Sequence, residues 1–152
     1  MKYTENEYDK FANQMETKYP EMFINPYGGF AIGPGCWPII EGLCGQIDAY
    51  TKWRNNTREA LLKDNPYNHK IPEAVKQVKV AQIKEKFGGL RFYYDGGDEQ
   101  INGMVRMAEV WAHNSCEDCG KPGQQRSGGW IKTLCDEHEA ERQARMKERF
   151  GS

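Results

Sequence analysis

The sequence has no long apolar run, almost no net charge and no recognisable leader segment, and each of these absences excludes a class of protein. No stretch approaches the roughly 18 consecutive apolar residues that a membrane-spanning helix needs, so we expect no membrane partner. Lysine and arginine number 21 against 22 acidic residues, which gives a formal charge of −1. Such an even balance creates no global field for nucleic acid or a membrane surface, so any electrostatic binding must be local.

The N-terminus and the cysteines indicate a cytoplasmic protein. The first residues, MKYTENE, are polar and no apolar segment follows them, as it would in a secretory signal. The five cysteines are odd in number and do not have the spacing of a secreted disulfide framework. In a reducing cytosol such cysteines bind metal or remain free thiols. Cys36 and Cys44 have no partner at metal-ligand spacing, so we expect them to be buried thiols.

Length and composition favour one domain with a small attached module. Apolar residues make up only 38% of the 152 residues and aromatic residues 12%, which predicts a modest, aromatic-rich core. We expect an α+β fold in which helices pack on a small antiparallel β-hairpin or sheet, followed by a C-terminal treble-clef-like zinc finger. The predicted division is an α+β domain over residues 1–114, with the hairpin near 78–94, and a zinc-finger module with a C-terminal helix over 115–150.

Apolar periodicity and helix punctuation predict three helices before the finger. The first runs from about Glu5 to Lys18, and the second runs from Pro38 to the Asn65-Pro66 pair. The third runs from about Glu99 to Asn114, with Asp98 as its N-cap in an Asp-Gly-Gly-Asp turn. The intervening segment 20–38 is rich in proline and glycine but also carries Tyr27, Phe30 and Trp37. Such an aromatic loop either packs on the core or lines a pocket.

Two β-rich runs within 78–94 flank Gly88-Gly89, which predicts a hairpin with these glycines as its two-residue turn. Lys86 would then face Arg91, and Lys84 would face Tyr93, on a cationic side. The opposite side would be mostly apolar, with the pairs Phe87–Leu90, Glu85–Phe92 and Ile83–Tyr94. Like charges placed opposite each other cost stability, so a bound anion would relieve them. The alternative is an ordinary solvated sheet face.

The strongest chemical signal is a pair of metal-ligand motifs. Cys116 and Cys119 stand two residues apart, fifteen residues follow, and Cys135 and His138 again stand two apart. Three thiolates and one imidazole complete the tetrahedral shell of a structural Zn²⁺ site, which leaves no open position for a reacting water. The first pair resembles a zinc knuckle closed by Gly120, and the second pair opens a helix. This order predicts a treble-clef finger.

Several of these motifs together resemble a group of small bacteriophage and bacterial proteins. They are the run KEKFGGLRFY at 84–93, the C-x2-C-G of residues 116–120, the SGGW of 127–130 and the LCDEH of 134–138. The resemblance covers roughly residues 78–138. It implies a viral or prophage accessory protein that acts in the host cytoplasm. Such proteins bind a host protein or sequester a nucleotide second messenger.

Three functions follow as hypotheses. The first is a non-enzymatic binding protein for a host factor or an anionic nucleotide, with Lys84, Lys86, Arg91 and Tyr93 on the phosphates and Trp37 on a base. The second is a nucleic-acid-binding zinc finger that uses Arg126 and Lys132. The third is a metal-dependent phosphodiesterase that would use the carboxylates of Asp95, Asp98 and Glu99, with Lys84 or His69 nearby.

Overall fold

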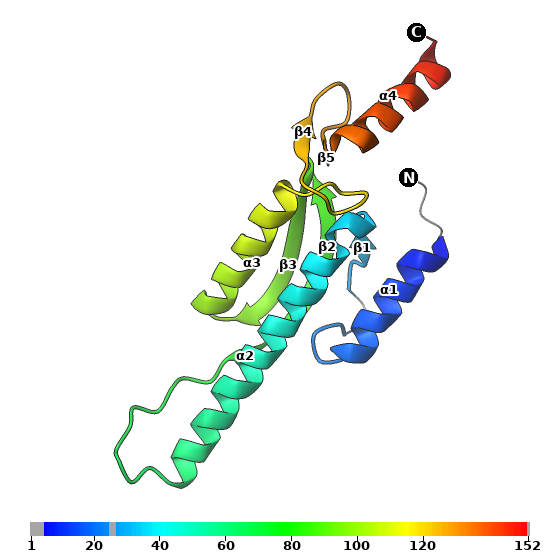
Figure 1. The fold of residues 1–152 in the computed structure, drawn as a ribbon. Helices are drawn as coiled ribbons and strands as arrows, with labels where there is room; N and C mark the ends of the chain where they lie inside the picture. The colour runs from blue at the N-terminus through cyan, green and yellow to red at the C-terminus, as the bar shows by residue number, and fades with distance from the viewer. Residues whose placement is uncertain (1–4, 25–26, 152) are drawn as a thin grey trace.

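The computed structural model describes residues 5–24 and 27–151, which form an α+β fold of four α-helices and two small sheets (Figure 1). Three helices match the predicted spans to within a residue or two: α1 (Glu5–Lys18), α2 (Trp37–Lys63) and α3 (Glu99–His113). The fourth, α4 (Asp136–Phe150), ends the finger. The strands are β1 (Phe30–Ala31), β2 (Lys76–Lys86), β3 (Gly89–Gly97), β4 (Gln124–Arg126) and β5 (Lys132–Leu134), and a short 3-10 helix, η1 (Pro34–Cys36), precedes α2.

The larger sheet has the order β1-β2-β3, with β2 and β3 antiparallel and β1 parallel to β2. The predicted turn at Gly88-Gly89 is wrong by one residue. Phe87 and Gly88 are the turn residues, at φ 54° and 79°, and a two-residue hairpin turn of this kind needs positive φ at both positions. Lys84 therefore lies opposite Arg91, and Ile83 lies opposite Phe92. Each β2 residue thus pairs with a β3 residue two positions earlier than predicted. Because side chains alternate between the two faces of a strand, a shift of two residues leaves the cations on the predicted face.

The predicted turn at 95–98 is also corrected, because β3 continues through Gly97. Asp95 pairs with Lys79 and Gly97 with Lys76, across a register irregularity between these two pairs. Asp98 does begin the next element as predicted. Its side chain accepts a hydrogen bond from the Ile101 N–H at 3.0 Å and caps α3.

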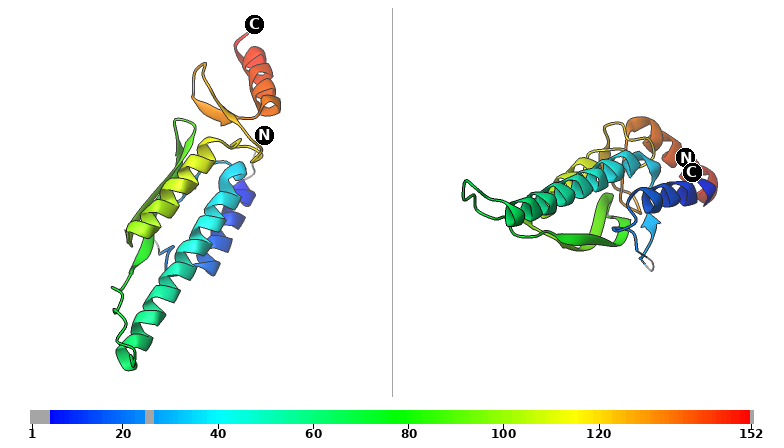
Figure 2. Two further views of the ribbon diagram at one scale, coloured as in Figure 1. Left: turned by 60° about the vertical axis from the view of Figure 1, so that its left-hand side comes forward. Right: turned by 90° about the horizontal axis from the view of Figure 1, so that it is seen from below.

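The core lies between the larger sheet and the first three helices, which all cover the same face of the sheet (Figure 2). Ile83 and Phe92 point into this core from the sheet, and Ile40 and Ile101 reach it from α2 and α3. The aromatic loop packs here as well: Phe30 contacts Phe23, and Phe30 and Trp37 both pack on Phe11 of α1. Among the described residues, no helix combines the length and the apolar character needed to cross a bilayer.

Candidate metal centre and adjoining groove

The four predicted ligands converge on one point. The sulfur and nitrogen atoms of Cys116, Cys119, Cys135 and His138 all lie within 4.8 Å of one another. The two thiol sulfurs of Cys119 and Cys135 are 3.8 Å apart, and Nδ1 of His138 lies 3.5 Å from the Cys116 sulfur and 3.2 Å from that of Cys135. A tetrahedral shell with metal–sulfur bonds of about 2.3 Å and a metal–nitrogen bond of about 2.0 Å has S···S edges of about 3.8 Å and S···N edges of about 3.5 Å. The site therefore has the dimensions of a metal shell.

Local structure presents these ligands. The knuckle follows α3 directly, and its turn closes through the Gly120 N–H, which donates to the Cys116 carbonyl at 2.8 Å. Gly120 has φ +81°, a conformation that suits glycine. Cys135 is the N-cap residue of α4, and His138 lies in the first turn of that helix. Knuckle, β4–β5 hairpin and helix follow one another as in a treble-clef finger.

The electrostatics of the thiols favour a bound cation. The backbone N–H of His138 hydrogen-bonds the Cys135 sulfur and lowers the pKa of that thiol to about 7. Loss of hydration, together with the neighbouring Cys116 and Cys135 thiols, raises the pKa of Cys119 to about 11. Several thiolates cannot lie this close without a positive charge among them, and a coordinated metal ion supplies that charge. Nε2 of His138 faces Glu141 at 4.0 Å, on the side of the ring away from the sulfurs.

The knuckle is also fixed from outside by the segment before α2. The Gly35 N–H donates to the Glu117 carbonyl at 2.7 Å, and the Gly33 N–H donates to the Glu117 carboxylate at 3.0 Å. A side chain at Gly35 would lie inside van der Waals contact of the Cys116 carbonyl and 2.6 Å from the Gly120 nitrogen. Burial raises the pKa of Glu117, and Lys132 opposes that shift from 3.8 Å away. The finger is therefore packed against the main domain.

A second set of contacts joins the finger to the tip of the β2–β3 hairpin. The buried Thr133 hydroxyl of β5 donates to the Gly88 carbonyl at 2.5 Å. The Gln125 side chain of β4 donates to the Phe87 carbonyl at 3.1 Å. The Glu117 N–H donates to the Thr133 carbonyl at 3.0 Å, which connects the metal knuckle to the same strand. The geometry of the hairpin tip thus depends on the finger.

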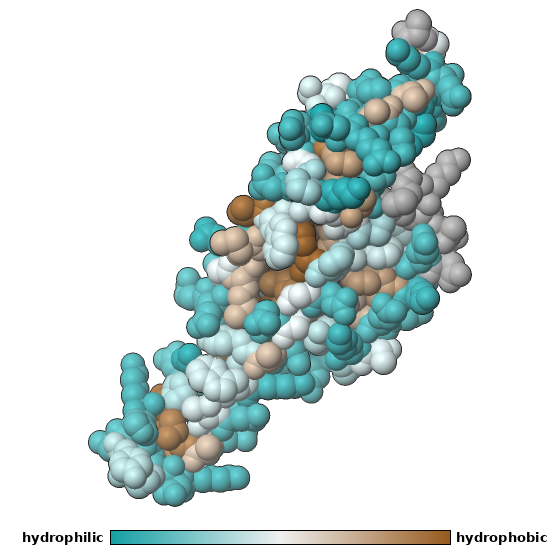
Figure 3. Space-filling model, viewed as in Figure 1, coloured by the Kyte–Doolittle hydropathy of each residue, from teal (hydrophilic) through white to brown (hydrophobic). Residues whose placement is uncertain are grey.

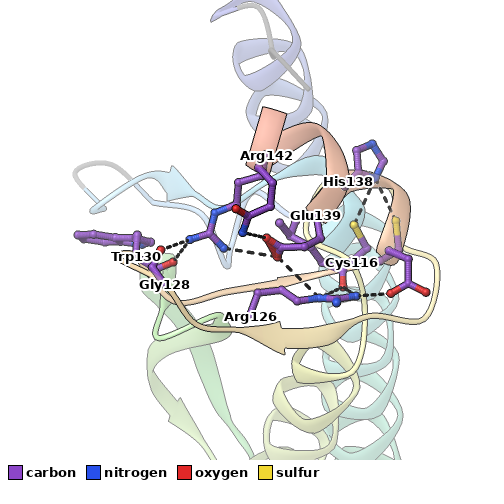
Figure 4. Close-up of polar contacts among 11 residues, drawn as sticks. Cys116, Arg126, Gly128, Trp130, His138, Glu139 and Arg142 are labelled. Atoms are coloured by element: carbon purple, nitrogen blue, oxygen red, sulfur yellow. Dashed lines mark hydrogen bonds and ion pairs between the residues drawn. The ribbon is translucent and has the colours of Figure 1, made fainter. Parts of the chain in front are cut away.

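The loop between β4 and β5 is held by α4 (Figure 4). The buried guanidinium of Arg142 donates to the carbonyls of Gly128, at 3.2 Å, and Trp130, at 2.5 Å. Glu139 lies between the Arg142 and Arg126 guanidinium groups, at 3.7 and 3.8 Å. These contacts join the helix that carries His138 to the loop that carries Trp130.

The finger and the hairpin tip enclose a groove of about 370 Å³. Its lining comes from two segments that are distant in sequence: Lys84, Glu85, Lys86 and Phe87 from the hairpin, and Gly129, Trp130 and Ile131 from the finger. Phe87 is 61% exposed and Trp130 is 72% exposed. The Glu85 carboxylate is engaged by the Gly88 N–H at 3.1 Å, whereas the Lys86 ammonium lies 5.7 Å from the centre of the Phe87 ring. The groove therefore combines two ammonium groups with two exposed aromatic rings. We call it the ligand groove, because it contains Lys84 and Lys86 of the predicted ligand set.

The structure brings only part of the predicted ligand set together. Lys84 and Lys86 line the ligand groove, but Arg91 lies in a neighbouring cleft beside α3. Tyr93 stands opposite Gln82 on the outer face of the sheet and is 43% exposed. Trp37 packs on the core side instead, where its ring stacks on Phe11 at 4.7 Å and its indole N–H donates to the Ile32 carbonyl.

Two lining residues that sequence analysis missed are Phe87 and Trp130. Phe87 was expected on the apolar face of the hairpin, but its place in the turn leaves the ring exposed. An aromatic residue next to paired glycines is the signal common to both positions, in Phe87-Gly88-Gly89 and Gly128-Gly129-Trp130.

The residues of the other two hypotheses have structural partners. Arg126 donates to the Leu134 carbonyl and pairs with Asp136 at 2.8 Å, and Lys132 lies beside Glu117. Asp98 caps α3 and accepts a hydrogen bond from the Tyr50 hydroxyl at 2.6 Å. Within the described chain, the Cys116–His138 set is the only group of three or more potential ligand residues that converges, so Asp95, Asp98 and Glu99 are not brought together as such a group.

The remaining cysteines are free and buried, as the sequence predicted. Burial raises the pKa of Cys36 to about 12 and raises that of Cys44 further. Both thiols therefore stay protonated and take no part in the metal shell.

In comparisons with known proteins, no family model, curated protein or solved structure matches this chain.

Proposed function

We propose that this chain is a non-enzymatic binding protein, in which one structural Zn²⁺ holds the finger against the β2–β3 hairpin and the ligand groove between them binds an anionic nucleotide. The observation that carries the proposal is the lining of the groove: the ammonium groups of Lys84 and Lys86 beside the exposed rings of Phe87 and Trp130. Phosphate groups pair with ammonium groups, and nucleobases stack on aromatic rings. The Cys3His donor set is typical of structural zinc.

The register of the hairpin supports an anionic ligand. Lys84 and Arg91 are directly opposed on adjacent strands, and like charges in that arrangement repel. Among the described residues, no ion pair neutralises Lys84, Lys86 or Arg91. A phosphate bound next to Lys84 relieves this repulsion. Removal of a repulsion that is already present in the free protein therefore contributes to the binding free energy.

The biological setting that we propose follows the resemblance of the motifs to phage and bacterial accessory proteins. The protein would work in the host cytoplasm and sequester a nucleotide signal. The alternative is that the protein binds and sequesters a host protein instead of a nucleotide. The mechanism needs only binding, because a ligand held in the groove is withdrawn from its receptor.

Isothermal titration calorimetry of the zinc-loaded protein tests the proposal. The titrants are nucleoside monophosphates and cyclic dinucleotides at about 0.1 M salt, where surface charges still act over roughly 10 Å. We expect at least one titrant to bind, and Lys84→Glu with Lys86→Glu should abolish the heat. Lys79→Glu is the matched control, since it reverses a lysine on the same strand outside the groove and should retain affinity.

The aromatic contribution has its own control pair. Trp130→Ala should weaken binding about tenfold or more, because stacking on one base contributes roughly 1–3 kcal/mol. Trp53→Ala removes a similarly exposed tryptophan from α2, outside the groove, and should leave the affinity unchanged. Absence of heat with every titrant, or equal losses for Trp130→Ala and Trp53→Ala, would overturn the nucleotide proposal.

A further inference from the structure

A second surface is built on the outer side of α3 and shares no residue with the ligand groove. Three large apolar side chains of this helix are exposed: Met107 by 66%, Val110 by 58% and Trp111 by 63%. Their spacing of three and four places them on one stripe of the helix. The stripe is distinct from the face that packs on the core, which carries Ile101, Val105, Ala108 and Ala112. Figure 3 shows apolar side chains at the surface over α3 and between α3 and α2.

Beside this stripe lies a cleft of about 370 Å³ between α3 and β3. Val110 belongs to both, so the stripe and the cleft are continuous. The cleft is lined by Arg91 of β3, by Arg106, Glu109 and His113 of α3, and by Asn114, the C-cap residue of that helix. Arginine and tryptophan, which both occur on this surface, are among the residue types that dominate binding energy at protein interfaces.

The charge in the cleft is positive. Its one carboxylate, that of Glu109, accepts the Phe92 N–H at 3.0 Å and so protects the outer edge of β3. Arg91 makes a hydrogen bond to the Leu90 carbonyl, and among the described residues neither Arg91 nor Arg106 has a carboxylate in ion-pair range. An occupant of this surface therefore needs apolar side chains for the stripe and carboxylates for the two guanidinium groups.

We propose that the outer face of α3 is a docking surface for an acidic amphipathic helix of a partner protein. The apolar face of that helix would cover Met107, Val110 and Trp111. Its flanking carboxylates would reach Arg91 and Arg106, where each planar guanidinium group can donate hydrogen bonds to both oxygens of a carboxylate. The surface makes this chain a two-site protein, because the ligand groove on the hairpin and finger remains open when α3 is covered.

Two synthetic helical peptides with the same Leu/Trp face test the proposal, one flanked by Glu and the other by Lys. Fluorescence anisotropy of the labelled peptides against the zinc-loaded protein gives the affinities. We expect the Glu peptide to bind about tenfold or more tightly than the Lys peptide. Arg106→Glu should reverse that preference, and Val110→Asp should abolish binding of both peptides. Leu62 of α2 is as exposed as Val110, so the Leu62→Asp variant should bind both peptides with the affinities of the parent protein.

Sedimentation equilibrium and circular dichroism complete the test. Unchanged spectra show that Arg106→Glu and Val110→Asp are folded. Equal affinity for the two peptides, or binding of neither, overturns the proposal. A concentration-dependent dimer that Trp111→Ala dissociates overturns it as well, because the occupant of the stripe would then be a second copy of this chain. Nucleotide binding at the ligand groove is measured separately, so either site can fail alone.

Discussion

Gly35→Ala perturbs the candidate metal centre without replacing a ligand side chain, and its effect can be worked out from the structure. The added Cβ would lie inside contact distance of the Cys116 carbonyl, 2.6 Å from the Gly120 nitrogen and 2.7 Å from the Glu117 carbonyl carbon. All three are backbone atoms of the knuckle, so no flexible side chain can swing aside. The η1 segment and the knuckle must separate by more than about 1 Å, and most at the Cys116 carbonyl, to reach ordinary contacts of roughly 3.5 Å. That movement also breaks the 2.7 Å hydrogen bond from the Gly35 N–H to the Glu117 carbonyl.

The cost has two parts. Loss of the hydrogen bond costs about 1 kcal/mol, and overpacking of a tight site costs about 1–3 kcal/mol more. We therefore expect Gly35→Ala to lower the free energy of unfolding by about 2–4 kcal/mol and to weaken zinc binding at least tenfold. Urea titration and competition with a chromogenic chelator measure the two effects. Gly42→Ala is the matched control, because nothing lies within 4 Å of the added Cβ and alanine in a helix gains about 0.5–1 kcal/mol. Parental stability and zinc affinity in Gly35→Ala would refute the claim that the segment before α2 holds the knuckle in place.

Two other predictions concern single hydrogen bonds. Thr133→Val leaves the buried Gly88 carbonyl without its donor and should cost about 1–3 kcal/mol in urea unfolding. Thr51→Val is the control and should lower the free energy of unfolding less, because the Ile47 carbonyl that accepts the Thr51 hydroxyl belongs to a regular helix. Equal losses for the two variants would contradict the docking of β5 on the hairpin. Burial opposes ionisation of Asp98, but hydrogen bonds from Tyr50 and from the start of α3 outweigh it and lower its pKa. Because the pKa of Asp98 is lower in the folded protein, its ionisation stabilises the fold at pH values above the unfolded pKa of about 4. The parent protein should therefore melt at a higher temperature than Asp98→Asn, by a constant difference near neutral pH and by a smaller one below pH ~4.

The convergence of the four candidate metal ligands was predictable because their spacing is itself the signal. Cys116, Cys119, Cys135 and His138 sit in two short motifs whose turn and helix start place the donors locally. The helices were predictable for a similar reason, since apolar periodicity and caps such as Asp98 act within a few residues. Only the approach of the Cys116–Cys119 pair to the Cys135–His138 pair depends on the rest of the fold.

The hairpin register was not predictable, because the run Phe87-Gly88-Gly89 offers two glycine-containing turns. Contacts from outside the hairpin favour the observed one. The Thr133 hydroxyl donates to the Gly88 carbonyl at 2.5 Å, and the Gln125 side chain donates to the Phe87 carbonyl at 3.1 Å. Both contacts come from segments that are distant in sequence.

The ligand groove was hidden for the same reason. Phe87 and Trp130 become neighbours of Lys84 and Lys86 only after the finger docks on the hairpin tip. Trp37 illustrates the converse, because a tryptophan in a glycine-rich loop suggested a binding surface, whereas stacking on Phe11 places it with the core. The two-residue strand β1 exists only through its pairing with β2, so no local pattern indicates it.

The central claim is that one zinc ion closes the finger, and X-ray absorption at the zinc edge tests it most directly. Protein purified from zinc-supplemented medium should carry one zinc per chain, with three sulfur neighbours at about 2.3 Å and one nitrogen at about 2.0 Å. His138→Ala should lose the nitrogen neighbour, and His113→Ala, a matched histidine outside the shell, should leave the spectrum unchanged. A metal-free protein, or a zinc shell of oxygen and nitrogen alone, would contradict the account.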